Sequence, residues 1–563
     1  MMKRILFYSS LTMWYLLLAN TTFAYTHADT LRGSNGRGRA WWDVRRYDLH
    51  LNFDTVSQSI QGYNIISFSI IKAPADSLQI DLQQPMQIDS VFIIEQYLLK
   101  RDIRKPEDTL IYTRIDYTRE GNVWWLHHNF HKWAIGQNKQ LLICYHGSPH
   151  KAVNPPWDGG FTWTRDSSGK QWIAVSCQGL GASVWWPCKD AQWDEPDNGM
   201  TISLQVPRRY KAVSNGRLTD TVMSADKRTI TWQWQVKNPI NNYDATFYIG
   251  DYVHWHDTLM GEKGKLDLDF WALRYNEERA KKQFAVVKQM IHCFEYWMGP
   301  YPFYEDGYKL VEAPYLGMEH QSAIAYGNNY KMGYKGFDRT GTGYGMDFDY
   351  IIVHESGHEW FGNNITARDE ADMWVHEGLT TYSESLFTEC LMGREKAMKY
   401  SKGERHNIQN DKPIIGDYGV NNEGSGDMYD KGASILYMIR VMAHDDDRFR
   451  MMLRGLGKEF YHQAVTTRQI EEYIAGHTGL DLKAFFNQYL RKADIPVLAY
   501  YLKDGALYYK FLNTVPGFTL PVEASSDERT ITIRPVGAWQ HLPWTGDAIK
   551  FSNDFLLKTK KQE

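Results

Sequence analysis

The sequence has no excess of positive charge. Its 563 residues include 63 Lys and Arg against 67 Asp and Glu, which gives a formal net charge of -4. Proteins that bind nucleic acid neutralise its phosphates with clustered basic residues. We therefore expect no nucleic acid partner for this chain.

Cysteine is also scarce, with five residues in the whole chain. A fold held together by disulfides needs a far higher density, so that class of protein is excluded. Because five is an odd number, at least one cysteine has no intramolecular partner, and a pairing of Cys177 with Cys188 stays open. The mean hydropathy of -0.51 argues against a protein with several membrane spans.

An apolar stretch at the start of the chain has the parts of a secretory signal peptide. Lys3-Arg4 precedes an uncharged apolar segment over residues 5–19, and small residues before and at Ala24 suit a cleavage site. We predict that residues 1–24 are removed and that the protein is periplasmic or secreted, with no stable membrane span. A retained anchor is the alternative, although the segment is short for a span of about 20 residues.

The periodicity of the mature chain changes twice. Residues 25–255 alternate between apolar and polar positions, which predicts a β-rich domain. Residues 256–492 have mainly helical spacing, and residues 493–563 return to alternation, as in a small β-sandwich. The chain is therefore predicted to be a multidomain α+β protein. The helices expected in its middle part include 277–297, 349–361, 374–392, 433–444 and 467–475.

A motif inside the predicted helix 349–361 carries the clearest chemical signal. It reads His354-Glu355-Ser356-Gly357-His358. Positions four residues apart lie on one face of a helix, so the two imidazoles can bind one metal ion. Glu355 between them can reach a water on that ion and act as general base. A surface helix with two solvated histidines is the simpler alternative.

Two imidazoles leave a catalytic zinc site incomplete, since it needs three protein ligands and one open position. Glu377 follows His358 after eighteen residues, near the start of the predicted helix 374–392, and a helix–loop–helix of this length can fold back. We predict one Zn²⁺ per chain, held by His354, His358 and Glu377. Glu384, two turns further on, could accept a ring N–H from a ligand histidine, with a solvated helix face as the alternative.

With that spacing, the motif resembles the signature of the gluzincin zinc aminopeptidases, which include aminopeptidase N and leukotriene hydrolase. Other matching segments are Trp360-Phe361-Gly362-Asn363, Leu316-Gly317-Met318-Glu319-His320, Tyr429-Asp430-Lys431-Gly432-Ala433, and Cys177-Gln178 followed by Trp186-Pro187-Cys188. The resemblance implies an N-terminal β-rich saddle domain, a thermolysin-like, mainly helical catalytic domain and a small C-terminal β-sandwich.

The resemblance also implies roles in binding and catalysis. Glu319, helped by Gln178, would hold the free amino group of a peptide, and Gly317 and Met318 belong to the same substrate-binding segment. Tyr429 would donate a hydrogen bond to the oxyanion. A free N-terminus carries a positive charge and an internal amide does not. The expected substrates are therefore peptides with a free N-terminus.

The sequence departs from the family pattern at three positions. His320 stands where the family has Asn, and Leu316 where it usually has Gly or Ala, which leaves the nearby subsite undefined. His376 replaces the Asn before Glu377, so an exchange of metal ligands is conceivable.

Three other functions stay open at this stage: a zinc endopeptidase that cleaves blocked peptides, an epoxide hydrolase on the same site, and a non-catalytic interaction protein. Retention of the base, the ligands and the oxyanion donor argues against the last. The sequence gives neither the preferred first residue nor the oligomeric state.

Overall fold

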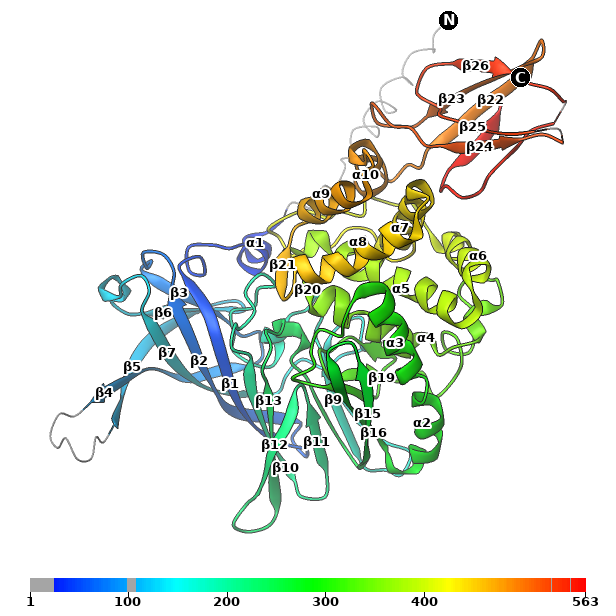
Figure 1. Cartoon of the computed structure of the whole chain (residues 1–563). Coiled ribbons are helices and arrows are strands. Elements are labelled where there is room, and N and C mark those ends of the chain that lie inside the picture. The colour runs from blue at the N-terminus through cyan, green and yellow to red at the C-terminus, as the bar shows by residue number, and fades with distance from the viewer. Residues whose placement is uncertain (1–24, 99–107, 528, 547, 563) are drawn as a thin grey trace, which may run out of the picture.

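The computed structural model describes residues 25–98, 108–527, 529–546 and 548–562 (Figure 1). The predicted signal peptide, residues 1–24, lies outside the described residues. A β-rich N-terminal part lies beside a mainly helical middle part, and a small C-terminal β part projects from the helices (Figure 1). The predicted α+β fold class is therefore confirmed.

In the described residues of the N-terminal part, two sheets follow a short helix α1 (His27–Gly33). The larger sheet has the strand order β12-β13-β10-β1-β2-β7-β4-β5-β6-β3 and the smaller one β11-β14-β9-β8. The strands are β1 (Trp42–Asp54), β2 (Ser59–Ile70), β3 (Ser77–Asp81), β4 (Gln87–Leu98), β5 (Asp108–Glu120), β6 (Val123–His127), β7 (Asn138–Gly147), β8 (Gly160–Arg165), β9 (Gln171–Ser176), β10 (Met200–Pro207), β11 (Lys211–Ser214), β12 (Arg217–Met223), β13 (Thr229–Val236) and β14 (Phe247–Gly250). Alternate residues of β1, including Tyr47, Leu49 and Leu51, are buried, which explains the period-two pattern.

The middle part begins with a five-stranded sheet of order β15-β16-β17-β19-β18. Its strands are β15 (Tyr252–Gly261), β16 (Gly264–Leu273), β17 (Tyr308–Glu312), β18 (Gly317–Met318) and β19 (Ile324–Tyr326), and a separate pair joins β20 (Ile365–Ala367) to β21 (Gln463–Val465). The domain boundary that we placed between residues 255 and 256 falls within β15. Because β15 pairs along its whole length with β16, this strand belongs to the sheet of the middle part.

Nine α-helices complete the described middle part. They are α2 (Glu277–Phe284), α3 (Val287–Met298), α4 (Tyr350–Gly357), α5 (Trp374–Met392), α6 (Arg394–Glu404), α7 (Asp430–Ala443), α8 (Asp446–Glu459), α9 (Thr467–Thr478) and α10 (Lys483–Arg491). Helix α5 has the predicted bounds, whereas the helix expected over 277–297 is divided into α2 and α3. The α-helix expected over 349–361 ends at Gly357; a π-helical turn over Glu359–Asn363 follows it, and the backbone leaves helical geometry there at Phe361 and Gly362.

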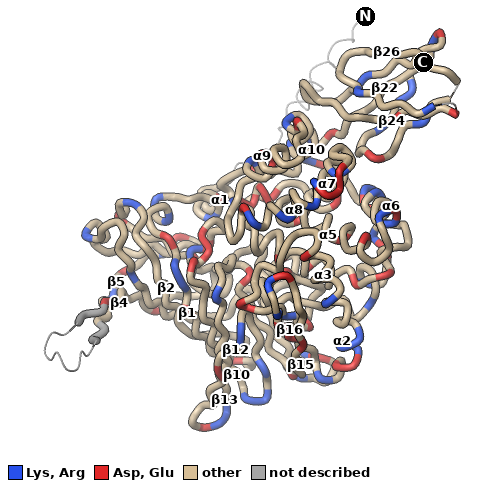
Figure 2. The backbone as a smooth tube through the Cα atoms, viewed as in Figure 1, with Lys and Arg blue, Asp and Glu red and all other residues tan. Residues whose placement is uncertain are grey.

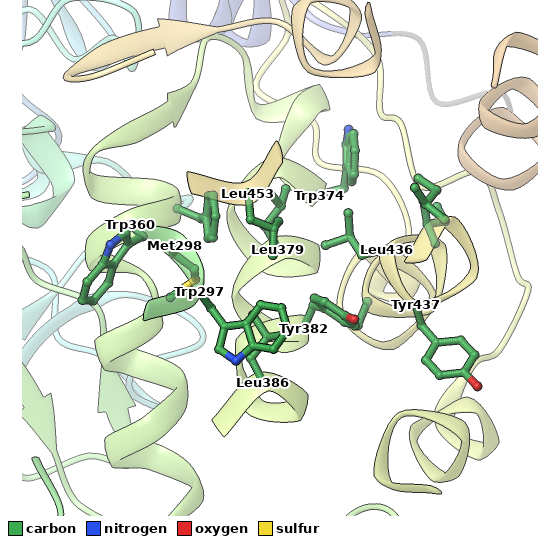
Figure 3. Close-up of a cluster of buried hydrophobic side chains, with 14 of the residues drawn as sticks. Trp297, Met298, Trp360, Trp374, Leu379, Tyr382, Leu386, Leu436, Tyr437 and Leu453 are labelled. Carbon is green, nitrogen blue, oxygen red and sulfur yellow. The ribbon is translucent and has the colours of Figure 1, made fainter. Parts of the chain in front are cut away.

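Helix α5 is the centre of the middle part. Its residues from Trp374 to Thr388 are all buried, so this stretch of the helix has no face towards solvent. Figure 3 shows Leu379, Tyr382 and Leu386 of this helix among side chains from neighbouring helices, including Trp297, Met298, Leu436 and Leu453. A helix packed on all sides holds its polar residues in fixed positions, and two of the predicted site residues lie on it.

Two small sheets form the C-terminal part. One has the order β26-β23-β22-β28 and the other β25-β24-β27. The strands are β22 (Val497–Lys503), β23 (Ala506–Leu512), β24 (Val522–Ser525), β25 (Thr530–Ile533), β26 (Gln540–Pro543), β27 (Lys550–Phe551) and β28 (Lys558–Lys561). Apolar residues of both sheets, such as Leu507, Phe511 and Val522, are buried together, as in the predicted sandwich.

Charges of both signs are interspersed along the chain in Figure 2. This agrees with the near balance of charge in the sequence. Within the described residues, no helix combines the length and the apolar character needed to cross a membrane.

A disulfide joins Cys293 of α3 to Cys390 of α5, while Cys144, Cys177 and Cys188 are free. The pairing of Cys177 with Cys188 that the sequence left open is therefore absent. We expect removal of the disulfide to lower the free energy of unfolding by about 2–5 kcal/mol, because it closes a loop of 97 residues in the unfolded chain.

Thermal unfolding with and without reductant measures this effect. The wild type should melt at a lower temperature in reductant, and a variant with alanine at both Cys293 and Cys390 should melt at that lower temperature in either condition. Cys144→Ser is the matched control, because this cysteine is free. Equal melting of the wild type in both conditions would contradict the prediction.

Candidate metal centre and active site

A cavity of about 670 Å³ lies where the N-terminal part, the five-stranded sheet and the helices meet. Residues from separate elements line it, and they include nine of the ten predicted site residues: Gln178, Gly317, Met318, Glu319, His354, Glu355, His358, Glu377 and Tyr429. The tenth, Glu384, lies behind this lining. The fold therefore brings residues as far apart in sequence as Gln178 and Tyr429 into one pocket.

Helix α4 places the two histidines. Asp349 caps its first turn by accepting a hydrogen bond from Ile351 N, and His354 and His358 follow one turn apart on the face towards the cavity. The helix lies very close to α5: a Cβ atom on Gly357 would come within 2.4 Å of the Ser383 hydroxyl. Glycine at this position permits the approach that brings the histidines to Glu377 on α5.

The geometry of the three predicted ligands fits a zinc ion. Glu377 Oε2 lies 3.3 Å from His358 Nε2 and 3.8 Å from His354 Nε2. Ligand atoms of a tetrahedral zinc site stand roughly 3.3 Å apart, given bonds of about 2.0–2.1 Å. Glu377 Oε2 is buried and has no hydrogen-bond partner among the described residues. A buried carboxylate oxygen without a donor is suited to a cation.

Both imidazoles are held through their Nδ1 atoms. His354 Nδ1 lies 2.8 Å from Glu384 Oε1, and Glu384 in turn accepts a hydrogen bond from the Tyr400 hydroxyl. His358 Nδ1 donates to the carbonyl oxygen of Phe361 at 3.0 Å. A carbonyl can only accept, so the proton of His358 is on Nδ1. Each ring therefore presents Nε2 to Glu377, as metal ligation requires.

The chain after α4 turns sharply to provide that carbonyl. Gly362 adopts a φ of 122°, a conformation that residues with a side chain rarely adopt. A Cβ atom there would also approach His358 Nδ1 to 3.2 Å and His376 Nδ1 to 3.4 Å. The early end of α4 is thus part of the arrangement that orients His358.

Electrostatics in the pocket favour an ionised Glu377 beside cationic partners. Burial opposes ionisation of Glu377, but the two imidazoles outweigh it and lower its pKa. Burial would lower the pKa of His354, yet Glu377 and Glu384 raise it to about 10. Burial raises the pKa of Glu355 to about 7. The carboxylates therefore attract positive charge to the imidazole end of the cavity.

The amino-group anchor predicted at Glu319 is a buried carboxylate with donors from the N-terminal part. Glu319 Oε1 accepts hydrogen bonds from Gln178 Nε2 at 2.8 Å and from the Tyr243 hydroxyl at 3.1 Å. Gln178 Nε2 also lies 3.3 Å from Glu377 Oε1. Burial raises the pKa of Glu319. The side-chain amide of Gln178 therefore lies between the Glu319 carboxylate and the predicted metal ligand Glu377.

Gly317 of β18 lies directly against Glu355. A Cβ atom on Gly317 would come within 2.4 Å of Glu355 Oε1, so a larger residue would displace that carboxylate. Met318 is buried in the same strand and lines the cavity. The segment that carries Glu319 therefore also fixes the position of Glu355.

A close helix crossing positions Tyr429. A Cβ atom on Gly432 of α7 would lie 2.7 Å from the Gly378 Cα atom of α5. Gly378 follows Glu377 directly, and Tyr429 precedes α7. The crossing therefore sets the separation of Tyr429 from Glu377, and the ring of Tyr429 stacks at 6.1 Å on that of His354.

We expect Gly432→Ala to destabilise the protein by about 1–3 kcal/mol, because the new methyl group meets backbone atoms that cannot move aside locally. The two helices must separate, which also shifts Tyr429 and lowers kcat. Chemical denaturation and turnover measure the two effects. Gly476→Ala on α9 is the matched control, because a Cβ atom there meets nothing within 4 Å. Equal losses of stability in both variants would show that the contact between α5 and α7 is not the cause.

The two histidines that depart from the family pattern lie outside the cavity lining. His320 is fully buried and its Nδ1 lies 2.7 Å from the Tyr248 hydroxyl. His376 Nε2 accepts a hydrogen bond from Ala367 N at 2.7 Å. Burial lowers the pKa of each to about 3, so both rings are neutral. His376 is therefore occupied as an acceptor, and the conceivable exchange of ligands has no support in this geometry.

Sequence reasoning missed three tyrosines that hold the site. Tyr243 donates to Glu319, Tyr400 donates to Glu384, and the hydroxyl of Tyr350 lies 3.3 Å from His354 Nδ1. Tyr350 could have been suspected, since it precedes His354 by four residues on the same helix face. For Tyr243 and Tyr400 the sequence contains no local signal.

Comparisons with known proteins agree with this geometry. The family model described as "Peptidase family M1 domain" matches residues 283–489. Aminopeptidase M1 of Arabidopsis thaliana is 22% identical over 372 residues, which cover 62% of this chain and 40% of that protein. Aminopeptidase B of Mus musculus is 24% identical, and the match covers 56% of this chain and 48% of that protein. Leukotriene A-4 hydrolase of Xenopus laevis is 22% identical, and the match covers 57% of this chain and 53% of that protein. The chain spans about half or less of the length of these relatives.

Solved structures show the same fold. An M1 zinc metallopeptidase from Deinococcus radiodurans, as a variant bound to a Tyr-Ser-Ala substrate, superposes with a TM-score of 0.64 at 17% identity, over 82% of this chain and 96% of that one. A two-domain M1 zinc metallopeptidase variant bound to L-arginine gives a TM-score of 0.62 at 17% identity, over 81% and 95%. The resemblance drawn from the motifs is confirmed, and residues 283–489 match the peptidase family M1 domain.

Proposed function

We propose that this protein is a zinc-dependent aminopeptidase that removes the first residue from peptides. The observation that carries the proposal is the position of Gln178. Its amide nitrogen is 2.8 Å from the buried carboxylate of Glu319 and 3.3 Å from the ligand carboxylate of Glu377. An amino group held at Glu319 therefore lies about one residue away from the metal position. That spacing selects the first peptide bond.

His354, His358 and Glu377 would hold the zinc ion, which when bound activates a water and polarises the scissile carbonyl. Glu355 lies beside this position, lines the cavity and is no ligand in the proposed set, so it can take the proton of the water and deliver it to the leaving amine. Tyr429 donates a hydrogen bond to the carbonyl oxygen as negative charge develops there. Glu384 keeps His354 in the ligating tautomer.

Substrate binding is proposed to rest on charge. The ammonium group of the substrate pairs with Glu319 and contacts the Gln178 side-chain oxygen, while Gly317 and Met318 form the adjacent wall. A blocked N-terminus would leave Glu319 buried without a counter-charge, which is unfavourable. This disfavours the endopeptidase alternative, and the comparisons give no reason to prefer an epoxide substrate.

We further propose that the protein acts in the periplasm or outside the cell. The signal-like segment at residues 1–24 supports this location. The disulfide between Cys293 and Cys390 agrees with it, because such bonds persist in oxidising compartments.

A panel of free and N-acetylated aminoacyl amides, assayed with and without a chelator, tests the function. We expect hydrolysis of the free amides alone, complete loss of activity on chelation, and recovery when zinc is added back. Cleavage of the acetylated amides at a similar rate would favour the endopeptidase. Activity that survives removal of all metal would overturn the proposal.

A further inference from the structure

Two glutamates of the cavity wall have no part in the mechanism above. Glu370 begins the short 3₁₀ helix Glu370–Asp372 before α5, and Glu423 lies in the loop before α7. Within the described parts of the chain, neither carboxylate accepts a hydrogen bond or has a Lys, Arg or His nitrogen within 4 Å. Two acidic groups thus face the catalytic cavity without a fixed partner.

Arg32 and Lys412 attract these carboxylates, but neither forms an ion pair with them among the described residues. Arg32 attracts Glu370, but its guanidinium donates to Asp190 O at 2.7 Å and pairs with Asp190 Oδ2 at 3.3 Å. Lys412 attracts Glu423 from an exposed position. Glu370 is half-buried, and burial raises its pKa to about 7, whereas Glu423 is exposed to solvent. A cation that enters the cavity can therefore meet both carboxylates, and Glu370 gains more from it because it is the less solvated of the two.

The charges of the occupied cavity do not balance without such a cation. Five glutamates line it: Glu319, Glu355, Glu370, Glu377 and Glu423. With all five carboxylates ionised, a zinc ion would offset two negative charges and the substrate ammonium a third, so up to two would remain. The one arginine of the lining, Arg339, already pairs with Asp430 at 3.0 Å. Uncompensated negative charge on the wall of a cavity favours a ligand of opposite sign.

The two glutamates also lie at the amino-group end of the cavity. Asn421 Nδ2 donates to Gly179 O at 3.3 Å, which joins the loop of Glu423 to the residue after Gln178. On this side the cavity adjoins a small hollow lined by Gly179, Glu370 and Asn421. A different hollow adjoins it at Trp157 and Leu316. The small hollow is also lined by Tyr243, which donates to Glu319, so the acidic wall and the residues proposed to hold the substrate ammonium belong to one side of the cavity.

We propose that Glu370 and Glu423 form the pocket for the first side chain of the substrate and select peptides that begin with lysine or arginine. This inference rests on the proposed aminopeptidase function and adds its substrate class. A charged hydrogen bond inside such a pocket is worth about ten- to a hundredfold in an equilibrium constant. A positively charged side chain should therefore be preferred by that factor over a neutral one of equal length.

The test compares kcat/KM of the zinc-loaded enzyme on lysyl and norleucyl amides, and on arginyl and citrullyl amides. In each pair the length is matched and only the charge differs. We expect the charged substrate to be preferred about 10- to 100-fold. Replacing both Glu370 and Glu423 by Gln should bring the ratio close to one, with norleucyl turnover largely kept. Glu278→Gln on the exposed surface of α2 is the matched control and should keep the preference.

A binding measurement separates specificity from chemistry. Calorimetry with lysine amide and norleucine amide on a Glu355→Gln background should show the same preference, and its loss when both wall glutamates are changed. Equal cleavage of norleucyl and lysyl amides by the wild type would overturn the specificity alone. A preference that survives in the double variant would overturn the role of these residues. If the enzyme cleaved none of the free aminoacyl amides, the aminopeptidase function would be overturned, and the proposed specificity with it.

Discussion

Replacing Glu355 by Gln is expected to lower kcat by about 10²- to 10⁴-fold while the zinc content stays at one ion per chain. Gln keeps the size and the position of the side chain against Gly317 but cannot accept a proton. The role of Glu355 in the proposed reaction is proton transfer, whereas the proposed metal ligands are the two imidazoles and Glu377. The prediction therefore separates the base from the metal site.

Zinc analysis by mass spectrometry and turnover of a lysyl amide measure the two quantities on the same sample. Glu377→Gln is the informative contrast, because it removes a charged ligand and should lower metal content and activity together. If Glu355→Gln kept kcat within tenfold of the wild type, another group would have to be the base. Loss of zinc in Glu355→Gln would instead place this carboxylate among the ligands.

The two ligand helices could be read from the sequence because their signals are local. His354 and His358 are one helical turn apart, and the bounds of α5 follow from an uninterrupted run of residues compatible with a buried helix. The spacing to Glu377 leaves only residues 358–373 between the two helices, although the structure places β20 within them. Helices close in sequence are usually adjacent in space, so the three residues could be expected together.

The end of α4 could not be predicted in the same way. Trp360 and Phe361 continue the apolar pattern, so the sequence favours a longer helix. The structure uses Phe361 differently, because its carbonyl oxygen accepts the hydrogen bond from His358. A glycine with positive φ at position 362 makes this possible. Functional geometry here overrides local helix propensity.

Contacts between segments that are distant in sequence could not be predicted, for a physical reason. Tyr243 reaches Glu319 from the N-terminal part, and Cys293 meets Cys390 across 97 positions. Neither pair has a periodicity or spacing that marks it, since the contact exists only after the sheets and helices have packed. Glu370 and Glu423 were missed likewise, because a lone acidic residue in a loop is ordinarily solvated.

Glu319→Gln is expected to lower kcat/KM for a free aminoacyl amide by about two to three orders of magnitude. The substitution keeps the side-chain volume but removes the negative charge that pairs with the substrate ammonium. The loss is large because the site is buried, so the ammonium would leave water without a partner. Zinc content should not change, since Glu319 is outside the proposed ligand set.

The decisive comparison is between free and N-acetylated substrates. The wild type should strongly prefer the free amide, and Glu319→Gln should reduce that preference by lowering the free-amide rate while the acetylated amide stays a poor substrate. Glu395→Gln, on the exposed surface of α6, is the matched control and should leave both rates unchanged. Suppose instead that Glu319→Gln kept the preference for a free N-terminus. The charge that selects chain ends would then lie elsewhere in the cavity, and Glu370 and Glu423 would be the remaining carboxylates able to supply it.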